Sequence, residues 1–379
     1  MITLGFESFL ENSTPYLNGK RWVLATHASA TTSRCESIVD VLVQAGFPLV
    51  KLFSGEHGLR GDVAAGDPAP DHVDRFTNLP VISLYGPRYT ADPTMFDDLD
   101  ALILDFQDIG ARYYTFTATM LSLMTAAHES GVPAYLLDRP NPIGGQIVEG
   151  NLLPEQARSI VGSLPVPIRH GLTLGELFSW YGHQQNWSKD FFHVIPCHGL
   201  TGSLLWADTG LPWVAPSPNS TGPTMALLYP GTCLIEGTNL SEGRGTAYPF
   251  EIMGAPFIDG HQLAKILNSH DHPGVRFRPV TFRPTASKHA DESCHGVQIH
   301  VRDPHRVESV AIGLDLIATM LSLWPDEVEI NPFMAKLSGI ENLRVLLDKA
   351  EYADLLREFQ SQSHDFRLAS QAHWLYPRN

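Results

Sequence analysis

Carboxylates, arginines and a histidine follow several short apolar segments of this chain. These residues are Glu56 and His57 after segment 47–53, Asp105, Asp108 and Arg112 within or after segment 100–106, and Asp138 at the end of segment 133–138. If the segments are parallel strands of one open sheet, their carboxyl ends share one rim, where ligands bind in such folds. Carboxylates can transfer protons and arginines can bind anions. The pattern therefore predicts a polar catalytic cleft, without identifying the reaction.

Each acid also has a structural alternative. Glu56 stands beside glycines, so it could cap a loop through hydrogen bonds to nearby backbone. Asp138 precedes Arg-Pro-Asn-Pro, where an acid often orders a turn. Asp105 could be the buried ion-pair partner of Arg112. Strand-end position alone does not decide between these roles and catalysis.

Other chemistries lack their motifs. Segment 21–27 is followed by Ala-Ser-Ala-Thr-Thr-Ser rather than a GxGxxG turn, and there is no Walker, GxSxG or HExxH motif. The cysteines are too scattered for a zinc knuckle or a redox CxxC pair, and we expect free buried thiols at Cys35, Cys197, Cys233 and Cys294. A cofactor is not expected.

Histidine spacing does not predict a metal centre either. His270 and His272, or His289 and His295, could bind a metal only with partners distant in sequence. We therefore expect no metal site and an activity that needs no metal.

The elements that must position the acids can be outlined from apolar runs. We expect strands at 21–27, 47–53, 80–85, 100–106 and 133–138, and helices at 33–45, 116–130 and 173–184. Ser33 is the expected N-cap of the first helix, and Thr173 with Glu176 forms a capping-box pattern at the third. This alternation predicts an α/β fold, a Rossmann-like and mostly parallel sheet with helices on both faces.

The later part of the chain changes character. Residues 211–256 are rich in Pro, Gly, Asn and Ser, which predicts ordered loops over a cleft. A helix near 260–268, a strand at 297–301, a helix near 307–323 and a helical C-terminus should follow. We place a domain boundary near residue 230, between a Rossmann-like catalytic domain (1–230) and a smaller α+β domain (231–379) that closes the cleft.

Composition limits the partners. The 379 residues are 43% hydrophobic and 18% charged, enough for sizeable cores, with a net charge of −15 and no basic cluster, so nucleic acid is not expected. The sequence has no apolar run of about 20 residues, so we expect no membrane span. The N-terminus lacks the features of a signal peptide, so we expect a cytoplasmic protein. If the chain is a processed form, the periplasm or the exterior of the cell is the alternative. The oligomeric state is left open.

Six segments resemble the NamZ-type exo-β-N-acetylmuramidase family, in that family's order and over most of the chain. They are FSGEHGLRGD (53–62), DFQDIGARYYTF (105–116), LDRPNPIGG (137–145), RHGLTLGEL (169–177), PSPN (216–219) and YPGTCLIEGTNLSEGRGTAYPFEIMGAP (229–256). Two positions depart from the family's habit. Gly55 replaces a usual proline, and His27 stands where the first strand commonly ends in asparagine. The stretch 63–78 is only loosely similar.

The resemblance implies exo-hydrolysis of β-linked N-acetylmuramic acid at a non-reducing end of peptidoglycan fragments, with Glu56 as the leading catalytic residue. Asp105 or Asp108 would be the second carboxylate, as base or electrostatic stabiliser, and the acetamido group of the sugar could also assist. Alternatives are a non-catalytic muropeptide-binding protein, or a phosphatase or esterase on the same scaffold.

The matched loops also contain the candidate substrate-binding residues. Arginines suit the lactyl carboxylate of the sugar, and polar or aromatic side chains suit its hydroxyls and ring. The candidates are His57, Arg60, Arg112, Tyr114, Asn219, Tyr229, Asn239, Glu242 and Arg244. The arginines could instead pair with loop acids, and the tyrosines could simply pack. We expect one cavity between the domains, lined by Glu56, Asp105, Asp108, Arg112, Asn239 and Arg244.

Overall fold

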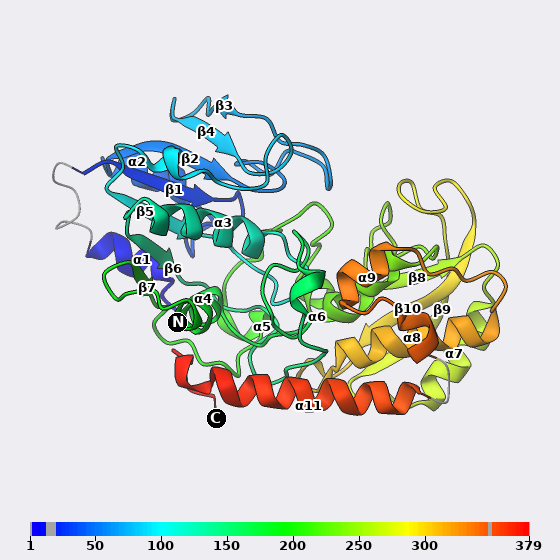
Figure 1. Cartoon of the computed structure of the whole chain (residues 1–379). Coiled ribbons are helices and arrows are strands. Elements are labelled where there is room, and N and C mark those ends of the chain that lie inside the picture. The colour runs from blue at the N-terminus through cyan, green and yellow to red at the C-terminus, as the bar shows by residue number, and fades with distance from the viewer. Residues whose placement is uncertain (1, 13–19, 348–350, 379) are drawn as a thin grey trace.

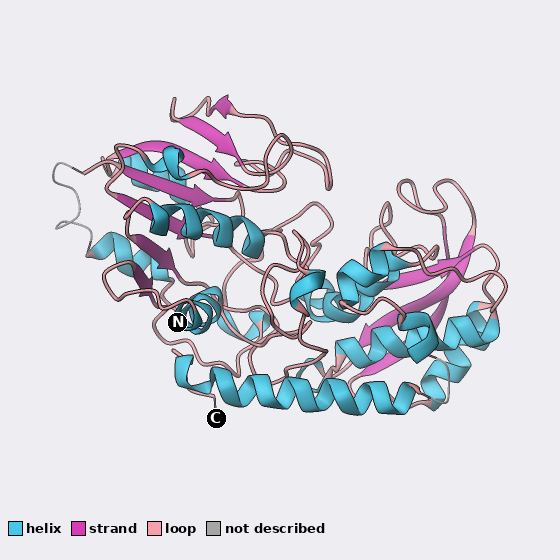
Figure 2. Ribbon diagram, viewed as in Figure 1, coloured by secondary structure: helices cyan, strands magenta, loops and turns pink. Residues whose placement is uncertain are grey.

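The computed structural model describes residues 2–12, 20–347 and 351–378, and these form two lobes (Figures 1 and 2). A seven-stranded, mostly parallel sheet with helices builds the first lobe, and a three-stranded antiparallel sheet with helices builds the smaller second one. This confirms the predicted α/β class with a smaller C-terminal α+β part. No helix of the described residues has both the length and the apolar character needed to cross a membrane.

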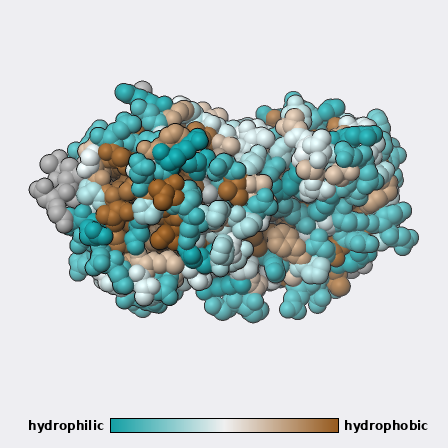
Figure 3. Space-filling model, turned by 90° about the horizontal axis from the view of Figure 1, so that it is seen from above, coloured by the Kyte–Doolittle hydropathy of each residue, from teal (hydrophilic) through white to brown (hydrophobic). Residues whose placement is uncertain are grey.

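The two lobes differ at the surface. On the face seen from above, hydrophobic residues gather on the lobe with the large sheet, whereas the other lobe is mostly hydrophilic (Figure 3). The outline of the molecule narrows between them in the same view.

The large sheet has the strand order β3-β4-β2-β1-β5-β6-β7. Its strands are β1 (Trp22–Thr26), β2 (Leu49–Ser54), β3 (His72–Val73), β4 (Pro80–Ser83), β5 (Ala101–Asp105), β6 (Ala134–Leu137) and β7 (Phe192–Ile195). All neighbours pair in parallel except β3 with β4. The five expected strands are present, whereas β3 and β7 were not anticipated.

Both faces of this sheet are covered, as predicted. Trp22 and Leu24 of β1 belong to one hydrophobic cluster, and Val23 and Ala25 belong to the other. The first cluster includes apolar residues of α1 (Gly5–Glu11) and α2 (Ile38–Gln44), and the second includes those of α3 (Phe116–Glu129) and α4 (Leu174–Gln184). A strand buried on both faces reads as a continuous apolar run, which is why β1 was visible in the sequence.

The second lobe begins with α6 (Pro223–Thr232), after the single-turn helix α5 (Trp206–Thr209). Its sheet has the order β8-β10-β9, with β8 (Ile252–Ala255), β9 (Val275–Phe282) and β10 (Cys294–Val301). Its other helices are α7 (Gly260–Ser269), α8 (Ser309–Leu323), α9 (Phe333–Ser338) and α10 (Leu343–Leu346). The predicted elements near 260–268, 297–301 and 307–323 are therefore present.

Two glycines let α6 and α8 cross at close range. A Cβ atom at Gly231 would lie 1.7 Å from the carbonyl oxygen of Ser309, and one at Gly313 would lie 2.2 Å from that of Gly231. No larger residue fits there without separating the helices. This contact fixes α6, which ends beside the candidate site.

The C-terminal helix α11 (Tyr352–Ser370) runs back from the second lobe along the first (Figure 1). Ser363 donates to the carbonyl oxygen of Gly150 at 2.7 Å, and the Tyr376 hydroxyl donates to Asp138 Oδ2 at 2.7 Å. The last residues therefore pack on the first lobe. The boundary near residue 230 falls within α6 and stays a prediction.

Three expectations need correction. The helix expected at 33–45 starts only at Ile38, after Ser37 rather than Ser33. Segment 211–256 is not all loop, because residues 223–232, with the buried apolar residues 225–228, form α6, and residues 252–255 form β8. Helix α1 and strand β9 were missed. All four cysteines are free, but Cys35 is exposed rather than buried.

The carboxylate of Asp138 has a structural role at the start of α4. Thr173 and Glu176 form the predicted capping box of α4. Asp138 accepts hydrogen bonds from the Thr173 hydroxyl at 2.7 Å and the Gly175 amide at 2.8 Å. Asp138 is therefore structural, but it orders the start of this helix rather than the Arg-Pro-Asn-Pro turn considered above.

Asp105, at the end of β5, forms a buried ion pair with Arg139. Arg139 donates through Nε to Oδ1 and through Nη2 to Oδ2, the latter at 3.2 Å, and both side chains are at most 5% exposed. The sequence-based alternative named Arg112 as the partner, and this is wrong.

We predict that Asp105→Asn lowers the free energy of unfolding by about 3–5 kcal/mol, because it leaves the Arg139 guanidinium buried without a counter-charge. Urea unfolding followed by circular dichroism measures this. Asp326→Asn, at an exposed position, is the matched control and should change the value by less than about 0.5 kcal/mol. An unchanged midpoint for Asp105→Asn would show that the pair contributes nothing.

Candidate active site

The strand order of the large sheet reverses at β1, which lies between β2 and β5. Chain connections leave such a point in opposite directions, so a crevice opens beyond the carboxyl ends of these strands. A cavity of about 590 Å³ contains residues that follow β2, β4 and β5 together with residues of the second lobe. Its lining is Glu56, His57, Ala65, Gly66, Tyr85, Tyr113, Tyr114, Thr115, Phe116, Val161, Ser217, Asn219, Tyr229, Glu236, Arg244, Gly245, Ala286, Ser287 and Phe333.

Glu56 lies in the loop after β2, with its carboxylate held at both oxygens. The Gly66 amide donates to Oε1 at 3.1 Å, and the Thr115 hydroxyl donates to Oε2 at 2.8 Å. Thr115 immediately precedes α3, so the bond ties two loops of the sheet's rim together. Glu56 is thus fixed in orientation while remaining partly exposed to the cavity.

The departure at Gly55 has a local explanation. A Cβ atom at this position would lie 2.9 Å from the Thr119 hydroxyl oxygen, on α3. The absence of a side chain at Gly55 therefore leaves room for the Thr119 hydroxyl, and Glu56 lines the cavity.

His57 shapes the same loop. Its φ of 70° is in the left-handed region, which is uncommon for a residue with a side chain. Its Nδ1 lies 3.1 Å from the Val63 carbonyl oxygen, so Nδ1 carries the proton and Nε2 is left as an acceptor. Burial lowers the pKa of His57, against the opposing effect of Glu56. A neutral imidazole therefore stands beside the carboxylate.

His27, at the end of β1, lies behind this loop. Its ring centroid is 6.1 Å from that of His57, and its Nδ1 lies 3.0 Å from the Ser29 hydroxyl. Burial, with a smaller contribution from His57, lowers the pKa of His27 to about 3. It is therefore a neutral packing residue near pH 7.

The second lobe contributes a charged group, Arg244. Its Nε and Nη2 donate to Glu236 Oε1 at 3.0 and 2.9 Å, and Nε lies 3.4 Å from Glu242 Oε1. Its guanidinium lies over the Phe250 ring, 5.0 Å from the centroid. In the described part of the chain no hydrogen bond engages Nη1, so Arg244 can still bind an anion in the cavity.

Aromatic rings surround these charges. The centroid of Tyr229 lies 6.3 Å from that of Tyr114 and 4.8 Å from that of Phe250, both edge-on. Burial raises the pKa of Tyr114 and of Tyr229, and burial together with Glu56 raises that of Tyr85. These hydroxyls therefore stay protonated near pH 7 and can donate hydrogen bonds.

Six of the twelve predicted residues line this cavity. They are Glu56, His57, Tyr114, Asn219, Tyr229 and Arg244. The cavity combines a carboxylate from one lobe with an arginine from the other, as expected. The expectation that Asp105, Asp108, Arg112 and Asn239 share it is wrong.

The two aspartates predicted as catalytic residues, Asp105 and Asp108, make contacts outside the cavity. Asp105 is buried in its pair with Arg139. Asp108 is buried, accepts from the Gly110 amide at 2.7 Å and lies 3.7 Å from His170 Nε2. Neither residue is among those that line the cavity. In the described part of the chain, Asp108 Oδ1 is buried without a hydrogen-bond partner.

Arg60 and Arg112 are structural. Arg60 is held by Asp40 and Asp74, at 2.9 and 2.8 Å, and its hydrogen bond holds the pKa of Asp74 at about 2. Arg112 donates to backbone carbonyls of both lobes, including Asn151 at 2.6 Å and Leu337 at 2.9 Å. Burial lowers the pKa of Arg112 only to about 10, so it is charged and joins the lobes.

Asn239 and Glu242 support loops of the second lobe. Asn239 bonds to the backbone of Glu327 and Glu329, at 2.7 and 3.0 Å. Glu242 is buried behind Arg244 and forms a second ion pair with Lys288 at 3.2 Å. Glu242 can therefore position Arg244 but does not line the cavity.

Some lining residues were missed by sequence reasoning. Thr115 and Glu236 lie within the matched motifs, and Tyr85 ends the strand predicted at 80–85, so their positions carried a signal. Ser287 and Phe333 come from segments without any motif, and only the tertiary structure brings them here.

The comparisons with known proteins agree with this architecture. The family description "Exo-beta-N-acetylmuramidase NamZ, N-terminal" matches residues 23–224, and "Exo-beta-N-acetylmuramidase NamZ, C-terminal" matches residues 227–376. The chain is 42% identical over 329 residues to the peptidoglycan beta-N-acetylmuramidase NamZ of Bacillus subtilis strain 168, which covers 86% of this chain and 79% of that protein.

Two crystal structures of DUF1343 family proteins from Bacteroides fragilis NCTC 9343 are also similar. One has a TM-score of 0.91 at 33% identity and covers 99% of both chains. The other has a TM-score of 0.78 at 28% identity and covers 100% of both. The fold, the matched segments and the family descriptions agree: this chain belongs to the exo-β-N-acetylmuramidase NamZ family.

Proposed function

We propose that this protein is an exo-acting glycoside hydrolase that releases terminal β-linked N-acetylmuramic acid from peptidoglycan fragments, in the cavity beyond β2 and β5. The observation that carries the proposal is the shared position of Glu56 and Arg244 in one cavity. The first supplies a proton-transferring group, and the second supplies a cation for the lactyl carboxylate that distinguishes this sugar from N-acetylglucosamine.

Glu56 acts as the general acid. Cleavage of a glycosidic bond requires a proton on the departing oxygen, because an alkoxide leaves poorly. Hydrogen bonds from Gly66 and Thr115 fix the carboxyl group, so its orientation is set before the substrate enters. His57 beside it is a neutral imidazole, because burial lowers its pKa.

Arg244 binds the lactyl carboxylate. Glu236 and Glu242 hold its Nε and Nη2, so the guanidinium is fixed while one nitrogen stays available. A planar guanidinium suits a carboxylate better than a lysine ammonium does. In a chain with a net charge of −15, such a local cation is what allows an anionic sugar to bind.

Aromatic and polar side chains complete the sugar site. Tyr114 and Tyr229 offer ring surface and protonated hydroxyls, and Asn219 can bond to sugar hydroxyls. Since Asp105 and Asp108 do not line the cavity and Glu236 is paired with Arg244, the acetamido group of the sugar is the candidate for internal nucleophile.

We predict that Glu56→Gln lowers kcat by at least about 10²-fold without changing the melting temperature, because the amide cannot donate the proton. The loss should be larger for a muramyl disaccharide than for a nitrophenyl muramide, whose phenolate leaves without help. Glu129→Gln, at an exposed position on α3, is the matched control and should behave as the wild type. Equal losses on both substrates, or a near-normal kcat, would show that Glu56 is not the acid.

We predict that Arg244→Lys lowers kcat/KM for a β-muramyl chromogenic glycoside by about tenfold or more, the scale of a charged hydrogen bond. The N-acetylglucosaminyl analogue lacks the lactyl group, so its weaker hydrolysis should change little. Parallel assays of both substrates measure the ratio. If both fall equally, Arg244 supports the cavity rather than selecting the sugar.

A further inference from the structure

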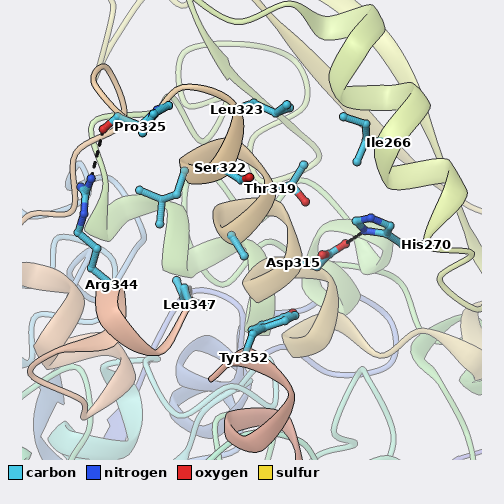
Figure 4. Close-up of a pocket in the computed structure, with 12 residues that line it drawn as sticks. Ile266, His270, Asp315, Thr319, Ser322, Leu323, Pro325, Arg344, Leu347 and Tyr352 are labelled. Atoms are coloured by element: carbon cyan, nitrogen blue, oxygen red, sulfur yellow. Dashed lines mark hydrogen bonds and ion pairs between the residues drawn. The ribbon is translucent and has the colours of Figure 1, made fainter. Parts of the chain in front are cut away.

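A second cavity, of about 840 Å³, lies in the second lobe and shares no lining residue with the candidate active site. Its lining includes apolar side chains of α8, Arg344 on one side, and His270 with Asp315 on the other (Figure 4). None of these polar groups takes part in the proposed hydrolysis.

Two imidazoles and one carboxylate converge at the edge of this cavity. His270 Nδ1 and His272 Nε2 each lie 2.7 Å from Asp315 Oδ2, and one atom of each residue lies within 4.8 Å of the others. In the described residues, this is the one group of three or more His, Cys, Asp or Glu side chains with that geometry.

The fold brings these residues together from separate elements. His270 directly follows α7, and Asp315 lies on α8. Between the two histidines, Asp271 has a φ of 52°, a left-handed conformation that aspartate tolerates better than most residues. This turn allows both rings to face the same carboxylate, although their centroids are 6.4 Å apart.

We propose that His270, His272 and Asp315 bind a divalent transition-metal ion such as Zn²⁺. Imidazole nitrogens with one carboxylate oxygen form an established three-ligand set for zinc, which accepts water in a further position. His272 and Asp315 have side chains only 14% and 12% exposed, whereas His270 and Asp315 border the cavity, which leaves room for water. A cluster of surface carboxylates alone would not offer the two imidazole nitrogens that lie beside Asp315.

The bound ion would join the end of α7 to α8. Asp315 and His272 are 43 residues apart, so no ligand motif is visible in the sequence. The site shares no residue with the cavity that contains Glu56 and Arg244, so we expect hydrolysis to continue without the ion.

Zinc titration of the full chain, stripped of metal with a chelator, tests this proposal by calorimetry. We expect one equivalent bound by the wild type, and a loss of affinity of at least about tenfold in His272→Ala and in Asp315→Asn, since even outer partners of metal ligands act on that scale. His261→Ala removes an exposed histidine of α7 itself and should bind zinc as the wild type does. This control matters because the chain has 17 histidines that can bind zinc weakly.

Thermal unfolding gives an independent readout. Zinc should raise the melting temperature of the wild type and of His261→Ala, but not that of His270→Ala, whose partly exposed side chain can be removed without loss of the fold. Equal zinc binding and equal thermal shifts in the wild type and all three site variants would overturn the proposal, leaving only a hydrogen-bonded cluster. Muramidase activity should survive chelation, and a loss restored by zinc would contradict the separation of the two sites.

Discussion

The hydrogen bond from Thr115 to Glu56 connects the two loops on which the candidate active site depends. One loop follows β2 and the other precedes α3, and the strand-order reversal at β1 places both beside the same crevice. With the Gly66 amide on the other oxygen, the carboxyl group has few orientations left. A fixed carboxyl group costs less to align with a substrate than a mobile one.

The second lobe must hold its own contribution at the right distance from that loop. The bonds of Arg112 to carbonyls of both lobes join the lobes. The close crossing of α6 and α8 at Gly231 and Gly313 fixes α6 within the second lobe. Glu236 and Glu242 then orient Arg244 toward the cavity. Half of the twelve site residues predicted from the sequence line the cavity, and the other half hold parts of the structure in place.

The sequence predicted the sheet well because its central strands are buried on both faces and appear as continuous apolar runs. It failed for α6, where Pro, Gly and Thr suggested a loop although residues 225–228 are buried. The sequence also could not show which of the arginines lines the cavity and which are structural. Arg60, Arg112 and Arg244 all lie in matched motifs, and only tertiary contacts show that Asp40 and Asp74 hold the first and backbone carbonyls the second. Ion-pair partners that are distant in sequence carry no local signal.

The central claim is that Glu56 and Arg244 hold opposite ends of one muramyl unit. A crystal structure of the Glu56→Gln protein soaked with an intact muramyl disaccharide tests it most directly. We expect the disaccharide in this cavity, with its glycosidic oxygen within hydrogen-bond distance of residue 56 and its lactyl carboxylate on Arg244. A sugar bound elsewhere, or one in this cavity with its glycosidic oxygen out of reach of residue 56, would contradict it.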